Sequence, residues 1–203
     1  MIRKKYSAGA VKFSFWFMEF RREVTLLSEG RSFQEIKELS QKENLFGAPT
    51  PARAAQICST VTARIRSLDE SFYPVFLSGD LATQKLFALV AAMADDTLFF
   101  DFVYGVIRDK LLIGSNEFTE TDVKAFFRDA QLQDEKAARW TDETVTRLAR
   151  TYKTMLYEAG VIDPPAQGKE VRRIYRPILE REMEDWLLAH DMECMIQALT
   201  GGK

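Results

Sequence analysis

The chain has 203 residues, of which 46% are hydrophobic and 29% are charged, and its net charge is −2. This composition is typical of a soluble protein of one or two domains with a real core, and it excludes low-complexity, repeat and membrane-spanning classes. Because the net charge is slightly negative, nucleic-acid binding would have to depend on a local basic cluster.

Two cysteines, Cys58 and Cys194, stand far apart in the chain. Their spacing fits neither a zinc site nor a disulfide framework, so we expect two reduced thiols. With no export signal at the N-terminus, the predicted location is the reducing cytoplasm.

An aromatic segment, "AVKFSFWFMEFRREV", follows the basic residues Arg3, Lys4 and Lys5. Lys12 and Glu19 bracket only six residues, too few for a signal peptide or a membrane span. Helical spacing instead predicts an amphipathic core helix, with Glu19, Arg22 and Glu23 on its exposed side. Its inner stripe is Phe13, Trp16, Phe17, Phe20, Val24 and Leu27. A helix lying on a membrane surface is the alternative.

The next part of the chain is a series of helices with recognisable starts. Ser32 and Glu35 form a capping box, and the helix runs to about Lys42. Thr50 caps the following helix, with Pro51 in its first turn. Two further helices are predicted, one capped by Asp80 and one running from Asp95 or Asp96 to Gly114.

After Gly114 the pattern changes. Thr119 caps a short helix, and Thr141 caps a long helix that ends at Gly160. "VI", the turn "DPPAQG" and "KEVRRIYR" then predict a short β-hairpin, and Pro177 opens a helix through Leu188 before a last short one. The predicted fold is all-α, a multi-helix protein with a C-terminal winged-helix-like module that carries one short β-hairpin. The predicted regions are 1–113 and 114–203.

Catalysis is not predicted. His190 is the only histidine, and the chain has no glycine-rich phosphate loop, zinc-protease motif or nucleophile elbow. The carboxylates of Asp95, Asp96, Asp101 and Asp109 are interpreted as helix caps and ion-pair partners, with Arg108 as a partner for Asp101. We therefore expect no enzyme activity, no cofactor and no metal site.

Residues 119–176 carry the most informative pattern, because a short helix, a long helix and a β-hairpin follow one another as in a winged helix. From Thr144 to Arg176 there are seven basic and three acidic residues, a local charge of +4. The predicted DNA-binding residues are Thr144, Arg147, Arg150, Thr151, Lys153, Lys169, Arg172, Arg173 and Arg176. A basic helix face that is simply solvated, or a winged helix that docks on protein, would show the same pattern of charges. If the chain does bind DNA, the basic N-terminal residues Arg3, Lys4 and Lys5 are a competing site.

Three segments, "YSAGAVKFSFWFMEF", "LFFDFVYGVIRDKLLIG" and "WTDETVTRLARTYKTMLYEAGVI", resemble in that order the BrxA family of BREX (bacteriophage exclusion) phage-defence systems. Members have been labelled putative inner membrane proteins, which the helix pattern above argues against. The resemblance implies a helical cytoplasmic protein without known enzymatic activity. It also implies a fold similar to that of nucleic-acid-binding proteins. The family has no catalytic residues that could be assigned to positions of this chain.

The partners implied by this resemblance are a DNA methyltransferase, an alkaline-phosphatase-like protein and ATPases. Together with the basic cluster, it predicts an accessory factor that binds double-stranded DNA mainly through phosphates, without a membrane partner. The alternative is an adaptor between BREX proteins. In that case we expect partly exposed aromatic docking faces around Trp16 and Phe17, or around Phe99 and Phe102.

Overall fold

The computed structural model describes residues 3–164 and 171–202. The first half contains η1 (Gly9–Lys12), α1 (Phe17–Ser28), α2 (Phe33–Lys42), α3 (Pro51–Ile65), α4 (Phe72–Ser78), α5 (Leu81–Asp95), α6 (Thr97–Phe102), the π-helical η2 (Val103–Arg108) and α7 (Asp109–Leu112). The second half contains β1 (Glu117–Thr119), α8 (Glu120–Gln133), η3 (Ala137–Arg139), α9 (Asp142–Glu158), β2 (Val171–Arg173), α10 (Arg181–Ala189) and α11 (Glu193–Thr200). The predicted all-α class with one small antiparallel sheet is confirmed.

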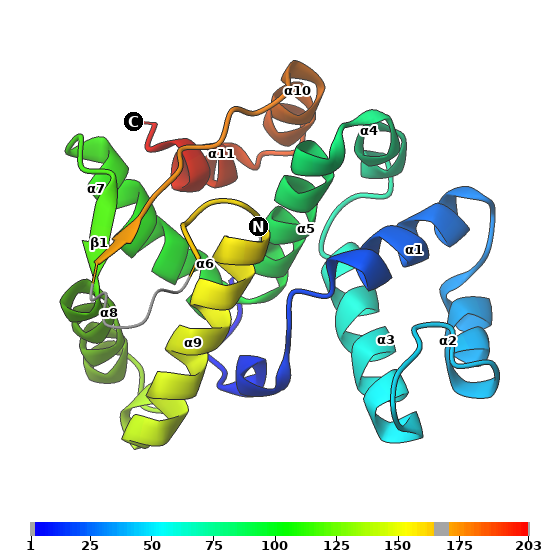
Figure 1. The fold of residues 1–203 in the computed structure, drawn as a ribbon, viewed down its shortest axis with the longest axis horizontal. Helices are drawn as coiled ribbons and strands as arrows, with labels where there is room; N and C mark the ends of the chain where they lie inside the picture. Colours follow the sequence, from blue (N-terminus) through cyan, green and yellow to red (C-terminus); the bar gives the residue numbers. More distant parts are fainter. Residues whose placement is uncertain (1–2, 165–170, 203) are drawn as a thin grey trace.

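The helices are arranged around α5. Figure 1 shows α1, α2 and α3 at one end of the molecule and α6, α8 and α9 toward the other, with α5 between the two groups. Residues 86–94 of α5 are all buried, as expected for a helix enclosed on every side. The C-terminal helices return to the first half of the chain, because α10 packs on α4 and α11 packs on η2.

The predicted helix caps are present. Ser32 and Glu35 form the reciprocal capping box of α2, and Thr50, Asp80 and Thr141 each accept a backbone N–H at the start of their helices. These side chains satisfy backbone donors that have no partner within the helix, so the helix starts follow from local sequence.

Helix α1 begins at Phe17, four residues later than predicted. Arg64 of α3 is buried, and its guanidinium donates hydrogen bonds to the carbonyl oxygens of Ser14 (3.0 Å) and Phe15 (2.7 Å). Because these carbonyls are bound to α3, they do not accept bonds within a helix, and Trp16 turns the chain at φ +52°. In the described part of the chain no helix has the length and apolarity needed to cross a membrane.

Two other helices differ from the prediction. Helix α10 begins at Arg181 rather than Pro177, and its N-cap residue Glu180 has an extended backbone. Before Pro177, the amide of Tyr175 donates to the carbonyl of Val161 at 2.7 Å. Helix α4 was not predicted, because its seven residues show little periodicity. Phe72 and Phe76 are buried against rings far away in the sequence, such as Phe20 and Phe87.

The sheet pairs β1 with β2 in antiparallel register, with Phe118 opposite Arg172. The predicted hairpin partner before the turn contributes a single bridge, Ile162 to Ile174. The longer pairing is with β1, which lies before α8 in the chain. A strand of three residues is too short for its alternation to be read from sequence.

Glu23 was predicted on the exposed side of α1, and this was wrong. Its side chain is fully buried, with Oε1 accepting a hydrogen bond from the hydroxyl of Thr62 on α3. Oε2 has no hydrogen-bond partner. Burial raises the pKa of Glu23 to about 7, because the charged carboxylate is poorly solvated between the two helices.

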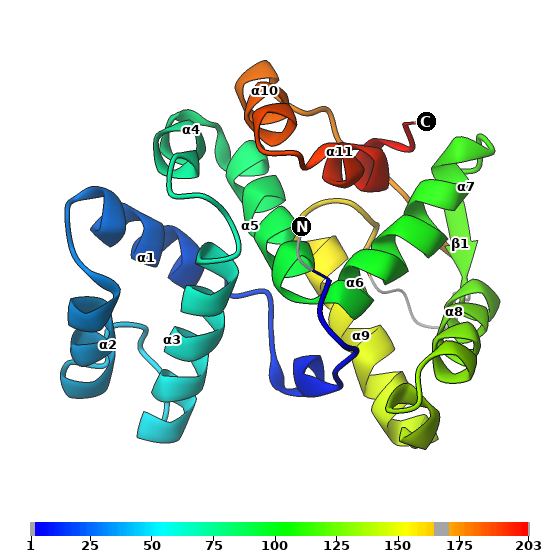
Figure 2. The ribbon, with the colours of Figure 1, turned by 180° about the vertical axis from the view of Figure 1, so that it is seen from behind.

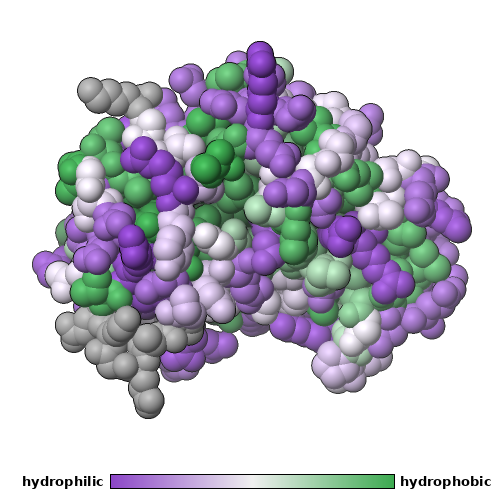
Figure 3. Space-filling view, turned by 45° about the horizontal axis from the view of Figure 1, so that its top comes forward, coloured by the Kyte–Doolittle hydropathy of each residue, from purple (hydrophilic) through white to green (hydrophobic). Residues whose placement is uncertain are grey.

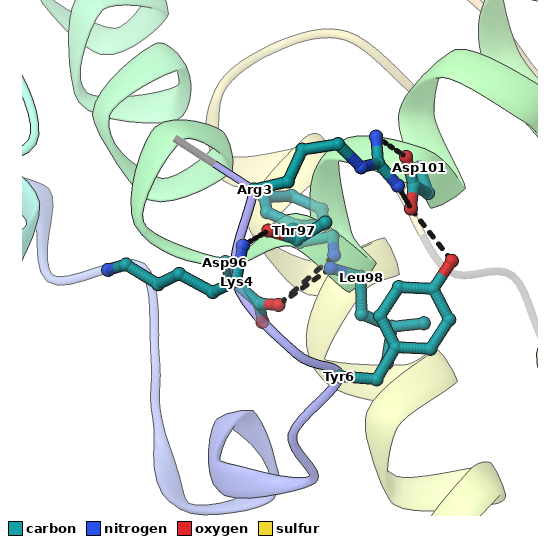
Figure 4. Close-up of polar contacts among 8 residues, drawn as sticks. Arg3, Lys4, Tyr6, Asp96, Thr97, Leu98 and Asp101 are labelled. Atoms are coloured by element: carbon teal, nitrogen blue, oxygen red, sulfur yellow. Dashed lines mark hydrogen bonds and ion pairs between the residues drawn. The ribbon is translucent and has the colours of Figure 1, made fainter. Parts of the chain in front are cut away.

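An N-terminal arm, residues 3–6, lies against α6 (Figure 4). Arg3 forms a two-pronged ion pair with Asp101 at 3.0 and 2.6 Å, and Tyr6 donates to Asp101 at 2.7 Å. The amide of Lys4 donates to the Thr97 hydroxyl at 2.7 Å. Figure 2 shows the arm crossing α6 and continuing to η1 beside α9. The predicted partner of Asp101 was therefore wrong: Arg108 pairs with Asp109 instead.

The burial of Glu23 predicts an unusual pH dependence of stability. A folded-state pKa near 7, above the ordinary value of 4.5, means that the folded protein holds this proton more tightly than the unfolded chain. The stabilisation is complete below pH 4.5 and is lost as the pH rises through 7. Glu23→Gln should therefore be more stable than the parent at pH 8, by roughly 1–3 kcal/mol, and similar at pH 5.

Urea unfolding curves at pH 5 and pH 8 measure this difference. Asp96, whose pKa burial raises to about 6, is present in both proteins, so the difference between them isolates Glu23. Glu29→Gln, at an exposed carboxylate after α1, is the control and should leave the free energy of unfolding unchanged at both pH 5 and pH 8. Equal pH dependence in Glu23→Gln and the parent would contradict the prediction.

The arm contacts predict a local effect of Asp101→Asn. Since the Arg3 side chain is 61% exposed, losing its ion pair should lower the free energy of unfolding by no more than about 1 kcal/mol. Amide hydrogen exchange at Lys4 should nevertheless rise several-fold, because its bond to Thr97 depends on a docked arm. Asp109→Asn, which leaves the arm untouched, is the control. Unchanged exchange at Lys4 in Asp101→Asn would count against the docking described here.

Candidate nucleic-acid interface

Helix α9 is held by a buried aromatic cluster. Tyr152 is fully buried, and its ring stacks on Phe99 with centroids 4.6 Å apart. Its hydroxyl donates a hydrogen bond of 3.1 Å to Asp96, the N-cap residue of α6. Burial beside this carboxylate raises the pKa of Tyr152 well above its usual value, so the hydroxyl remains a donor. The inner face of α9 is thereby fixed against α6.

The opposite face of α9 carries the predicted helix residues. Arg147 and Arg150 are exposed, and Thr144 and Thr151 are half-buried. Arg147 lies 3.9 Å from Glu143, one turn earlier, in a loose ion pair between exposed side chains. Within the described residues Arg150 forms no ion pair. Two cations on one exposed face can contact phosphates.

Two predicted cations are held in ion pairs of the protein itself. Lys153 pairs with Glu120 at the start of α8, and its side chain is only 17% exposed. Arg172 in β2 is buried, with Nε 3.0 Å from Asp163 and a second bond to the Asp163 carbonyl. Both side chains therefore tie elements together, and their charges are offset by carboxylates.

The remaining predicted cations follow α9 in the chain. Arg173 is exposed and lies over the ring of Tyr175 at 5.9 Å. Arg176 is exposed and donates to the carbonyl of Leu111 at 3.3 Å. Lys169 lies outside the described residues. The exposed cations therefore form two groups, one on α9 and one after α9.

Three cations outside residues 144–176 line a further hollow. Lys136 and Arg139 were missed by the sequence analysis, and Lys5 was expected only as part of the competing N-terminal site. Lys5 of the arm meets Lys136 and Arg139, of the connection between α8 and α9, around a hollow of about 440 Å³. The spacing of Lys136 and Arg139 in the connector was a weak signal. Lys5 is too distant in sequence to be linked with them without the structure.

His190 has a structural position. Its ring stacks on Trp186 at 4.1 Å, and Nδ1 lies 2.7 Å from the Trp186 carbonyl oxygen. Nε2 is 3.1 Å from the hydroxyl of Ser71, which precedes α4. These contacts connect α10 with α4.

The aromatic docking faces expected for an adaptor were predicted wrongly, because Trp16, Phe17, Phe99 and Phe102 are all buried in the core. Other apolar side chains are exposed instead. Met18, Leu81 and Tyr157 line a hollow of about 800 Å³ between α1, α5 and α9. A second exposed set comprises Leu112, Ile113, Tyr175 and Ile178. Figure 3 shows green surface at the end of the molecule that carries α7 and β1.

Comparison with known proteins identifies relatives along most of the chain. A family model described as BrxA matches residues 4–191. BREX protein BrxA of Bacillus cereus (strain H3081.97) is 34% identical over 173 residues, 85% of each chain. BREX protein BrxA of Paramagnetospirillum magneticum (strain ATCC 700264 / AMB-1) is 24% identical, covering 80% of this chain and 81% of the relative.

A solved structure shares the fold. The crystal structure of an uncharacterized protein from Magnetospirillum magneticum aligns with a TM-score of 0.77 at 18% identity. The alignment covers 98% of this chain and 100% of that one, so the fold is shared over nearly the whole length of this chain. From the family match and the Bacillus cereus relative, the chain belongs to the BrxA family of BREX proteins.

Proposed function

We propose that this component of a BREX phage-defence system is a non-enzymatic accessory factor that binds duplex DNA, mainly through phosphate contacts. The observation that carries the proposal is the exposed face of α9. Arg147 and Arg150 share that face, while the opposite face is locked into the core by Tyr152. A rigid helix with outward cations meets a phosphate backbone without rearrangement.

The order of elements supports a winged-helix interpretation. Strand β1 is followed by α8, α9, the bridge residue Ile162 and then β2, and β1 pairs with β2. In winged helices the second helix of the pair enters the major groove, and the chain after it contacts the adjacent backbone. Helix α9 would be the recognition helix, and Arg173 and Arg176 would flank it.

The region 114–203 remains our proposed unit for DNA binding. Its last two helices share a core with the first half, through contacts such as the Trp186 indole N–H with the Ser71 hydroxyl at 3.0 Å. The first half would then hold the unit rigidly. The arm is a weaker competing DNA site than a free basic tail, because Arg3 and Lys4 are engaged with Asp101 and Asp95.

The proposal predicts how binding depends on salt. Arg147, Arg150, Arg173 and Arg176 are exposed, and each neutralised phosphate contributes about −0.9 to the slope of log affinity against log salt. If these four meet phosphates, the slope should be about −3 to −4, with little preference for DNA sequence. Fluorescence anisotropy with unrelated duplexes at several salt concentrations measures it.

Charge reversal tests the two groups separately. Arg147→Glu with Arg150→Glu, and Arg173→Glu with Arg176→Glu, should each weaken binding to all duplexes and flatten the slope by about 2. Arg172 is left unchanged because reversing a buried, paired arginine would damage the sheet. Arg21→Glu with Arg22→Glu reverses two exposed charges on α1, at the other end of the molecule (Figure 1), and serves as the control.

An adaptor is the second candidate, and the exposed apolar hollow beside α1 favours it. Leu81 is 55% and Met18 is 64% exposed there, and such side chains at the rim of a hollow are typical of protein-docking surfaces. Under this alternative, Leu81→Asp with Met18→Asp would abolish association with another BREX protein, and the arginine variants would leave it intact. Absence of duplex binding by the parent protein at low salt would reject the DNA proposal and favour the adaptor.

A further inference from the structure

We infer that Lys5, Lys136 and Arg139 form a phosphate site that holds one backbone phosphate of the duplex beside the start of α9. The site presupposes the proposed DNA binding and deepens it, because it adds the N-terminal arm to the interface. These three residues line one hollow of about 440 Å³, together with Gln133, Asp134 and Glu135.

The arm holds Lys5 in position. Its neighbours on both sides are bound to α6, because Arg3 and Tyr6 contact Asp101 and the Lys4 amide contacts Thr97. The Lys4 side chain also pairs with Asp95, the last residue of α5. Figure 4 shows the contacts of Arg3, Lys4 and Tyr6 with Thr97 and Asp101 of α6. Among the described residues Lys5 forms no ion pair, so in this short run it is the cation left for a ligand. A docked arm loses little further entropy when Lys5 binds an anion.

The connection between α8 and α9 is equally well fixed. Asp134 Oδ1 accepts the amide N–H groups of Lys136 (2.9 Å) and Ala137 (2.8 Å), which starts η3. Ala137 is buried, and Gln131 donates to the Trp140 carbonyl at 3.1 Å, which ties the turn back to α8. Lys136 and Arg139 therefore extend from a rigid turn.

The charge in the hollow favours an anion. Its lining has three cations against Asp134 and Glu135, and one oxygen of Asp134 is already taken by two backbone donors. Within the described residues neither Lys136 nor Arg139 pairs with a carboxylate. Arginine and lysine side chains that line one open hollow suit a phosphodiester, whose two non-bridging oxygens share one negative charge.

The position of the hollow fits a duplex on α9. Arg139 lies two residues before Thr141, which caps α9, and Arg147 lies on the exposed face of the same helix. A backbone phosphate held at the turn would fix where α9 sits along the duplex. Phosphate contacts of this kind set the register of a DNA-binding helix without reading bases.

The test is a duplex titration of the full chain by anisotropy at several salt concentrations. Lys136→Glu with Arg139→Glu should weaken binding at least tenfold at low salt and flatten the slope by about 1, the contribution of one phosphate. Lys5→Glu alone should also weaken duplex binding, and Lys5→Arg, which keeps the positive charge, should bind as the parent does. Inorganic phosphate at millimolar concentration should not compete, since the site holds a phosphate only as part of a duplex.

Three outcomes would overturn the inference. Unchanged binding by Lys136→Glu with Arg139→Glu, while the α9 reversals weaken it, would remove this site and leave the proposed function standing. An equal loss in Arg21→Glu with Arg22→Glu would mean that only net charge matters. Absence of binding by the parent would remove the proposed function and this site together. If circular dichroism shows that the charge-reversal variant is unfolded, Lys136→Gln with Arg139→Gln replaces it, and its duplex affinity and salt slope are measured in the same way.

Discussion

The hydrogen bond from the buried hydroxyl of Tyr152 to Asp96 joins α9 to the first turn of α6. Asp96 also accepts the amides of Leu98 and Phe99, so one carboxylate both caps α6 and receives α9. The Tyr152 ring lies among Phe99, Phe102 and Phe127, where centroid distances run from 4.6 to 6.2 Å. Replacing either partner would leave a polar group in this aromatic environment without its bond, which is costly. Because this contact fixes the rotation of α9, it also decides which side chains the helix exposes.

The rotation of α9 separates its cations into two kinds. Arg147 and Arg150 face outward, whereas Lys153 points toward α8 and pairs with Glu120. Arg172 is similarly withdrawn into the sheet by Asp163. A cation already paired and partly desolvated gains little from a phosphate, because its existing partner must first be displaced. The number of basic residues in a segment therefore overstates the charge available for binding.

The first half of the chain contributes more than a scaffold. Its arm docks on α6 and brings Lys5 to the turn before α9, although more than 120 residues separate them in sequence. Arg64 donates hydrogen bonds to the carbonyls of Ser14 and Phe15 in the segment before α1. Glu23 lies buried between α1 and α3. The buried Glu23 carboxylate makes the stability of this end of the molecule depend on pH, and Asp96 beside Tyr152 has the same effect in the aromatic cluster around α9.

The sequence by itself determined the helical class, the caps at Ser32, Thr50, Asp80 and Thr141, and the family, because capping and periodicity act over a few residues. It also identified the basic run after Thr144. Only the tertiary structure decided which of those cations are exposed, that Glu23 is buried and that Asp101 binds Arg3. The start of α1, the existence of α4 and the pairing of β1 with β2 likewise depend on groups far away in the chain. Burial and ion pairing arise from contacts between distant segments, and local pattern carries no information about which segments will meet.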